Sequence, residues 1–279
     1  MHWPRDLRDW PNCNSSRRIV SGSQVWHVQE AGTGPALLLI HGAGASTHTW
    51  RNLLPFLLPT HRLIAIDLPG HGFSQPPHRV REGLPYLSMA LTRLCIQEAW
   101  SPIAVIGHSA GAAVGLGVAL ALNCKHLAIN PAYRSFDGIG KWLMPSLARF
   151  VLNSPGLVGA WTALVQARTI RKILDHTGSS IDEEGLGYYL RLASDRSHVR
   201  GTLDMMQHWS FAGIEEELAR LGQHSSVLLG SNDRTIRPHG TADFLSRFPA
   251  IEVEIQEGPG HLMHEEAPGP VCTWIKKHL

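Results

Sequence analysis

A serine flanked by glycines, in the pentapeptide Gly-His-Ser-Ala-Gly at residues 107–111, is the strongest chemical signal in this chain. An apolar run at 103–106 precedes it and a segment of small apolar residues at 112–122 follows it, which predicts a strand, a sharp turn and a helix. Such a turn strains the serine backbone and leaves no room for a Cβ on either glycine. The pattern therefore indicates that Ser109 is a nucleophile presented at the tip of a sheet.

Two further residues could activate that hydroxyl. Asp233 and His261 each follow a predicted strand, as the serine does. Ligand sites of open α/β sheets lie at these strand ends, so the three side chains are expected to converge. His261 would remove the proton of Ser109 as general base and later protonate the leaving group, while Asp233 would hold the imidazole in the required tautomer.

Two other residues compete for these roles. His264 lies three residues after His261, and one helical turn would separate them, so only one can meet both partners. The glycine-rich turn before His261 favours that residue. Asp67, in a loop punctuated by glycines, is interpreted as holding its own loop through hydrogen bonds to the backbone, not as a catalytic acid.

The oxyanion that forms when a serine attacks a carbonyl group needs backbone donors. The amide of Ala110, directly after the serine, is the first candidate. The segment His-Gly-Ala-Gly at 41–44 follows another predicted strand, and we assign the second amide to Ala43, with Gly44 as the alternative. A plain glycine-rich turn without chemistry is the competing interpretation of each loop.

The 17 histidines do not occur at a spacing that predicts a metal site. The segment His-Leu-Met-His-Glu at 261–265 is neither the HExxH zinc motif nor its inverse. We expect most histidines at the surface or at helix ends, and we predict no metal and no cofactor.

Apolar runs recur along the chain at the spacing of strands, with helix-like segments between them. After a half-buried hairpin at 18–29, the predicted strands are 36–40, 63–66, 103–106, 127–129, 226–229 and 251–255. Predicted helices include 47–58, opened by a capping threonine, and 84–100. Continuous apolar strands are typical of parallel sheets buried on both faces. The fold class is therefore α/β, with a doubly wound, mostly parallel sheet.

The alternation of strands and helices stops between residues 132 and 213. We expect 1–131 and 214–279 to form the core domain, and 132–213 to form a helical cap inserted over the site, where a lid can exclude water. The cap's large side chains, which suit a bulky apolar ligand or the cap's own small core, are Trp142, Met144, Trp161, Tyr188, Tyr189, Met205, Met206, Trp209 and Phe211.

Composition excludes several classes of protein. A hydrophobic content of 43% and a charged content of 17% predict a globular chain, and a net charge of +2 without a dense basic cluster argues against nucleic acid. Four scattered cysteines and the absence of a signal peptide predict a cytoplasmic protein with reduced thiols. The apolar run 103–122 is about long enough to cross a bilayer. We interpret it as a buried strand and helix, so we predict a soluble protein without a membrane span.

From about residue 18 to the C-terminus, the chain resembles the α/β-hydrolase superfamily, whose triads follow the same order of serine, acid and histidine. A narrower set of segments is similar to the magnesium-chelatase accessory proteins of bacteriochlorophyll biosynthesis: 8–12 (Arg-Asp-Trp-Pro-Asn), 16–17, 25–29 (Val-Trp-His-Val-Gln), 41–45, 47–51, 67–73 and 107–113. This resemblance implies a role around magnesium insertion into protoporphyrin, with a tetrapyrrole as ligand and magnesium-chelatase subunits as partners.

Two classes of function follow. The first is a serine hydrolase, esterase-like, that cleaves an ester or related acyl bond of a bulky apolar molecule such as a tetrapyrrole. The second is an accessory protein that handles tetrapyrroles or associates with the chelatase, with chemistry secondary. A C–C bond hydrolase with the same triad is a weaker third option, whereas a serine nucleophile argues against dehalogenase and epoxide-hydrolase chemistry. Cap arginines that could pair with porphyrin propionates are Arg134, Arg149, Arg168, Arg171 and Arg191.

Overall fold

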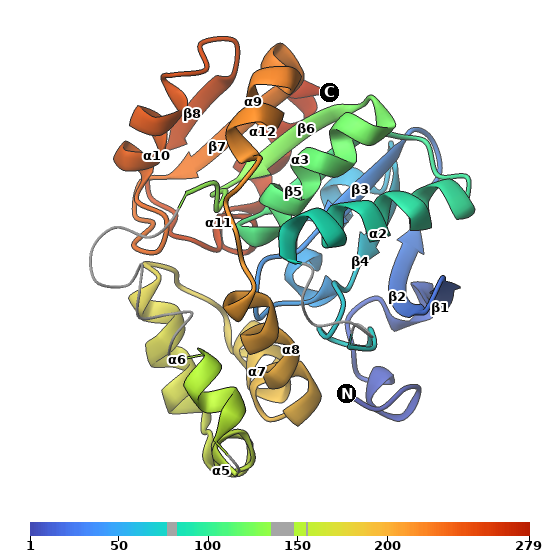
Figure 1. The fold of residues 1–279 in the computed structure, drawn as a ribbon, viewed down its shortest axis with the longest axis vertical. Coiled ribbons are helices and arrows are strands. Elements are labelled where there is room, and N and C mark those ends of the chain that lie inside the picture. Colours follow the sequence, from blue (N-terminus) through green and yellow to red (C-terminus); the bar gives the residue numbers. More distant parts are fainter. Residues whose placement is uncertain (77–82, 135–147, 155) are drawn as a thin grey trace.

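The computed structural model describes residues 1–76, 83–134, 148–154 and 156–279 of the chain. Its sheet has eight strands in the order β1-β2-β4-β3-β5-β6-β7-β8 (Figure 1). The β1–β2 and β2–β4 pairs are antiparallel and the other pairs are parallel, which confirms the predicted fold class. The strands are β1 (Ser16–Ser21), β2 (Gln24–Ala31), β3 (Ala36–Ile40), β4 (Arg62–Ile66), β5 (Pro102–His108), β6 (Lys125–Ile129), β7 (Ser225–Gly230) and β8 (Glu252–Gln256).

Strand β3 shows why the central strands are continuous apolar runs. All five of its residues are buried, because β4 and β5 pair with it on both sides and helices cover both faces. Leu38 and Ile40 face one hydrophobic cluster, while Leu37 and Leu39 face the other. Side chains that alternate between two buried faces leave no position for a polar residue.

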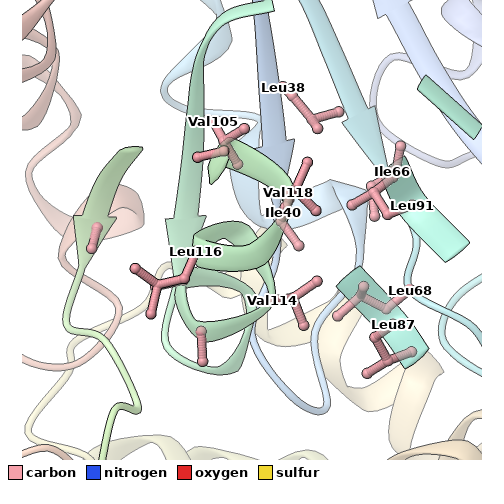
Figure 2. Close-up of a cluster of buried hydrophobic side chains, with 14 of the residues drawn as sticks. Leu38, Ile40, Ile66, Leu68, Leu87, Leu91, Val105, Val114, Leu116 and Val118 are labelled. Atoms are coloured by element: carbon pink, nitrogen blue, oxygen red, sulfur yellow. The ribbon is translucent and has the colours of Figure 1, made fainter. Parts of the chain in front are cut away.

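Helices of the core divide between these two clusters. Figure 2 shows the first cluster, where side chains of β3 and β5 pack against α2 (Gly83–Gln97) and α3 (Ala110–Leu122). Also on this side are α9 (Ile214–Leu221) and α10 (Pro238–Leu245). The second cluster includes residues of α1 (Leu54–Leu57), α11 (Met263–Glu266) and α12 (Pro268–His278).

The apolar run 103–122 is divided between β5 and α3, as predicted. Among the described residues, no helix combines the length and apolar composition needed to cross a bilayer.

The helix predicted at 47–58 is wrong. The segment forms a 3₁₀ turn, η3 (Thr47–Trp50), and then the short α1, with a turn between them. Pro55 stands in the first turn of α1, where proline is tolerated because its missing N–H is not needed; further into a helix it would remove a hydrogen bond. Thr47 does not cap the segment; its own N–H donates to Asp67 Oδ1 at 2.7 Å.

The described helices within the segment predicted to be a cap include α5 (Leu157–Leu164), α6 (Ala167–His176), α7 (Glu183–Ala193) and α8 (Arg196–Gln207). Figure 1 shows them as one group beyond the end of the sheet near α11. The part of 132–213 that the structure describes contains no strand. The division into core and cap at these boundaries stays a prediction, and Trp142 and Met144 lie outside the described residues.

The helical group shares its apolar contacts with the core. Ile170, Leu174, Leu186 and Tyr189 form a cluster with Ala45 and Leu262, which belong to loops of the sheet domain. Tyr189 is therefore buried at the junction and is not part of a separate core.

Candidate active site

Ser109 stands in the turn between β5 and α3 with φ 52° and ψ −117°. A positive φ is strained for a residue with a Cβ. Three backbone hydrogen bonds hold it: the Ser109 N–H donates to Ile129 O at 3.0 Å, and the N–H groups of Ala112 and Ala132 each donate to Ser109 O at 3.1 Å. A Cβ on Gly111 would lie 2.2 Å from the carbonyl oxygen of Ile40. The pentapeptide thus forms a tight turn with the serine at its tip.

The structure brings Ser109, Asp233 and His261 into hydrogen-bond contact. The imidazole Nε2 of His261 lies 3.1 Å from Ser109 Oγ, and its Nδ1 lies 2.7 Å from Asp233 Oδ2. The other carboxylate oxygen of Asp233 accepts the N–H groups of Thr235 and Ile236 at 2.7 and 2.8 Å. These bonds fix the carboxylate, which in turn orients the imidazole with Nδ1–H toward Asp233 and the Nε2 lone pair toward the hydroxyl.

His264, the rival base, is directed elsewhere. Its Nε2 lies 2.6 Å from the hydroxyl of Thr49, and its ring packs against Trp50 and His108 at centroid distances of 4.7 and 4.4 Å. Burial lowers the pKa of His264 to about 3, with the nearby His261 and Arg51 adding to the effect. His261 is therefore the histidine that reaches the serine hydroxyl.

One predicted oxyanion donor directly follows Ser109, and the other belongs to a loop that approaches it. Ala110 is the first residue of α3, where backbone N–H groups have no partner inside the helix. The loop that contains Ala43 approaches from β3, and a Cβ on its Gly42 would lie 3.1 Å from Ser109 Cβ. Gly44, the alternative donor, has a φ of 75°. The assignment of Ala43 and Ala110 to an oxyanion hole stays a prediction.

Asp67 holds its loop, as its position predicted. Its Oδ1 accepts the Thr47 N–H, and its Oδ2 accepts the Phe73 N–H at 2.9 Å and contacts His27 Nδ1 at 2.6 Å. The carboxyl group is fully buried, yet the neighbouring His27 and these donors lower its pKa. Asp67 is thus an ionised side chain that binds together β2, η3 and its own loop.

The expectation that most histidines lie at the surface or at helix ends is wrong. Seven fully buried imidazoles have pKa values lowered by burial, and they are His41, His48, His71, His108, His126, His198 and His264. Several of them bond to the backbone. His41 donates from Nδ1 to Gly42 O at 2.7 Å and accepts the Leu68 N–H at Nε2. A neutral imidazole offers one donor and one acceptor, so it can satisfy buried peptide groups of two loops.

The described residues contain one group of potential metal ligands, Glu252, Glu254 and His278. The ammonium of Lys277 already pairs with both carboxylates, at 3.1 and 2.7 Å. This group lies on β8 and α12 and includes none of the residues around Ser109.

The loop 177–180, between α6 and α7, contacts the segments that carry both the acid and the base. The Arg234 N–H donates to Thr177 O at 3.0 Å, and the Leu262 N–H donates to Ser179 Oγ at 2.8 Å. These residues could not be identified from the sequence, because contacts made through backbone amides leave no pattern of side-chain types.

A buried ion-pair cluster joins α7 to α11. The Glu265 carboxylate accepts the hydroxyls of Thr49 and Tyr189, at 2.5 and 2.6 Å, and also pairs with Arg51. Arg51 Nη2 reaches Asp182, the N-cap residue of α7, at 2.9 Å. The helical group therefore contacts the core at Glu265, which lies four residues after His261 in the sequence.

The arginines proposed for propionate binding differ in their surroundings. Arg191 donates to Asp6 O at 2.6 Å, Arg134 donates to Gly240 O at 2.6 Å, and Arg171 pairs with Glu183. Arg149 and Arg168 are exposed. A ligand would thus compete with protein acceptors for three of the five arginines, and the hypothesis is best tested at the other two.

Comparison with known proteins identifies the family of this chain. The profile of the alpha/beta hydrolase family matches residues 37–274, and the chain belongs to this family. It is 36% identical to the magnesium-chelatase 30 kDa subunit of Rhodobacter capsulatus, over 98% of this chain and 99% of that protein. It is also 24% identical to a 2-hydroxy-6-oxo-2,4-heptadienoate hydrolase of Pseudomonas putida, over 81% of this chain and 82% of the relative.

A solved structure shows the same fold. An alpha/beta hydrolase fold protein from Burkholderia ambifaria superimposes with a TM-score of 0.75 at 20% identity, covering 94% of this chain and 97% of the other. Both resemblances expected from the sequence, to the α/β hydrolases and to the magnesium-chelatase accessory proteins, are confirmed.

Proposed function

We propose that this protein is a serine hydrolase that cleaves an ester or related acyl bond of a bulky apolar molecule. The hydrogen-bonded chain from Ser109 through His261 to Asp233 is the observation that carries the proposal. A hydroxyl in contact with an imidazole, which is itself oriented by a carboxylate, is the arrangement that activates serine for acyl transfer.

The reaction would proceed in two steps. His261 Nε2 takes the proton of Ser109 as Oγ attacks the carbonyl carbon, and the same nitrogen then protonates the leaving alcohol. Water, deprotonated by His261, attacks the acyl-serine and releases the acid, which returns the serine to its starting form. The amides of Ala110 and Ala43 would bind the oxyanion in both steps, and losing one such donor typically costs roughly 3–4 kcal/mol.

The substrate class rests on the relative from Rhodobacter capsulatus and on the helical group over the site. That relative is named as a magnesium-chelatase subunit. A tetrapyrrole carries carboxylate side chains that form esters, and a predicted cap with aromatic side chains suits such a large apolar ring. We place the activity in the cytoplasm, because all four cysteines are free thiols.

Labelling with a fluorophosphonate tests the nucleophile. We expect the wild type to be labelled once per chain at Ser109, and Ser109→Ala to lose all labelling, because the probe reacts only with an activated serine. Ser101→Ala, which removes an exposed serine, is the control and should be labelled like the wild type. A folded wild type that does not react would reject the proposal; if it does react, a series of p-nitrophenyl esters of increasing acyl length measures the size of the acyl pocket.

The match to the magnesium-chelatase subunit over nearly the whole of both chains supports a second candidate function, as an accessory protein of magnesium chelatase. The two functions differ in their dependence on Ser109. If purified magnesium chelatase inserts magnesium faster with this protein, and Ser109→Ala stimulates it equally, the accessory function is independent of hydrolysis. The relative from Pseudomonas putida supports C–C bond hydrolysis less strongly, and product analysis would distinguish it.

A further inference from the structure

Asn130 is a fully buried side chain that joins the segments around the candidate triad. It directly follows β6 and has a left-handed backbone, with φ 44°. Its Oδ1 accepts the Gly230 N–H at 2.8 Å, and its Nδ2 donates to Gly260 O at 3.0 Å and to His261 O at 2.9 Å. One amide group thus spans the ends of two loops that are 30 residues apart in the chain.

The groups that Asn130 binds belong to the loops of the acid and the base. Gly230 is the last residue of β7, and its carbonyl accepts the N–H of Asp233 at 3.1 Å. The other two partners are the carbonyl of the base itself and that of the residue before it. Asn130 therefore links the backbone that carries Asp233 to the backbone that carries His261, beside a direct bond in which the Asn232 N–H donates to Pro259 O at 3.0 Å.

The same short segment also holds the serine. Two backbone bonds of Ser109 involve near neighbours of Asn130: the Ser109 N–H donates to Ile129 O, and the Ala132 N–H donates to Ser109 O. His108, just before the serine, donates its Nε2–H to His261 O at 2.9 Å, so this carbonyl has two donors. The Asn130 side chain is therefore placed where the segments of all three triad residues meet.

The chemistry of the position favours asparagine. The amide offers a donor and an acceptor in one plane, whereas an ionised aspartate of the same shape can only accept. An aspartate there would face two carbonyl oxygens at hydrogen-bond distance. Because the site is buried, water cannot readily replace a lost bond, and an unpaired carbonyl would be costly.

We propose that Asn130 is a positioning residue for the hydrolase, which keeps His261 within reach of both Ser109 and Asp233. The inference rests on the proposed function, because it concerns the efficiency of the same triad. Misplacing a catalytic group by about 1 Å can cost on the order of 100-fold in rate. The loss of rate in an Asn130 variant should appear in the chemical step and not in the binding of the reagent.

Two variants separate the effect of the Asn130 side chain from the effect of its backbone conformation. Asn130→Gly keeps the left-handed conformation and removes all three bonds, while Asn130→Asp keeps the shape and removes the donor. Asn123 is a matched control, since it is exposed at the end of α3 and also has a positive φ, of 52°. Asn123→Gly and Asn123→Asp should react like the wild type.

The measurement is the rate of fluorophosphonate labelling as a function of reagent concentration. For both Asn130 variants we expect the maximal rate constant to fall about 10- to 100-fold, with the half-saturating concentration and the final labelled fraction unchanged. A residue that only supported folding would instead lower the labelled fraction and leave the rate constant as it is. If Asn130→Gly does not fold, the measurement on Asn130→Asp alone tests the proposal.

Three results would overturn the proposal. Wild-type rate constants in both variants would reject the positioning role and leave the serine hydrolase intact. A loss confined to the labelled fraction would show that Asn130 is structural. A wild-type protein that is not labelled at Ser109 would reject the hydrolase itself, and the positioning role with it.

Discussion

Each nitrogen of the His261 imidazole has its own partner, so the position of its proton follows from its neighbours. Asp233 accepts the Nδ1–H, which leaves the Nε2 lone pair for the hydroxyl of Ser109. The amides of Thr235 and Ile236 hold the second oxygen of Asp233. Single residues thus determine the tautomer, and the tautomer determines whether the serine can lose its proton.

Asp233→Asn should reverse this tautomer. The two backbone amides need an acceptor, so the carbonyl oxygen of the new side chain would face them and its NH₂ would face His261. Nδ1 would then accept, Nε2 would carry the proton, and Ser109 would lose its base. We expect labelling by the fluorophosphonate to slow on the order of 10⁴-fold without loss of folding.

Asp243→Asn, an exposed aspartate on α10, is the control for this change and should not alter the rate. A rate for Asp233→Asn within tenfold of the wild type would contradict the assigned tautomer.

At the scale of elements, a buried ion pair attaches α7 to α11. Arg51 and Glu265 are 6% and 1% exposed as side chains, so their ion pair lies inside the protein. Burial raises the pKa of Glu265, and the donors around it, led by Arg51, oppose that shift. Removing one member would leave the other charge buried without its partner. The bonds of Asp182 to Arg51 and of Tyr189 to Glu265 connect the pair to the helical group.

Arg51→Met should destabilise the fold, because it leaves the Glu265 carboxylate buried without its cation. Breaking a buried pair in this way typically costs about 3–5 kcal/mol. Urea denaturation would measure the free energy of unfolding. The matched control is Arg247→Met, which removes an exposed arginine paired with Glu215 and should cause no comparable loss. Equal losses in the two variants would show that burial of the Arg51 pair has no energetic consequence.

At the scale of the whole molecule, the buried histidines link stability to pH. Burial lowers the pKa of His126 from 6.5 to about 4, and its Nε2 donates to Ala112 O at 2.9 Å while Nδ1 contacts Ser225. Between these two pH values the unfolded chain binds a proton that the folded chain does not. The contribution of His126 to the free energy of unfolding is therefore fully present above pH 6.5 and is lost as the pH falls toward 4.

Several buried histidines act in the same direction, so the free energy of unfolding should fall steeply between pH 6.5 and 4. His126→Gln should reduce that slope, because glutamine can donate a hydrogen bond but does not titrate. Urea denaturation at pH 7.5, 6 and 5 measures the effect, with the exposed His176→Gln as control. An unchanged slope for His126→Gln would rule out the predicted contribution.

Much of the fold was predictable from local patterns. Apolar runs such as 36–40 and 103–106 identified the central strands, since a strand buried on both faces excludes polar residues along its whole length. The predicted helix at 47–58 failed because the chain there follows contacts to the Asp67 loop and not its own helical periodicity. The prediction of exposed histidines failed for a related reason. The partners that allow an imidazole such as His41 to be buried are peptide groups, including one in another loop.

The sequence by itself determined the fold class and which three side chains could meet, because in a parallel sheet each residue that follows a strand lies at the same edge. The sequence favoured His261 over His264 as the base, but only the tertiary structure decided that His264 bonds to Thr49, and that Asn130 links the acid loop to the base loop. Those outcomes depend on hydrogen bonds between segments far apart in the chain, and a local pattern of residue types does not contain them.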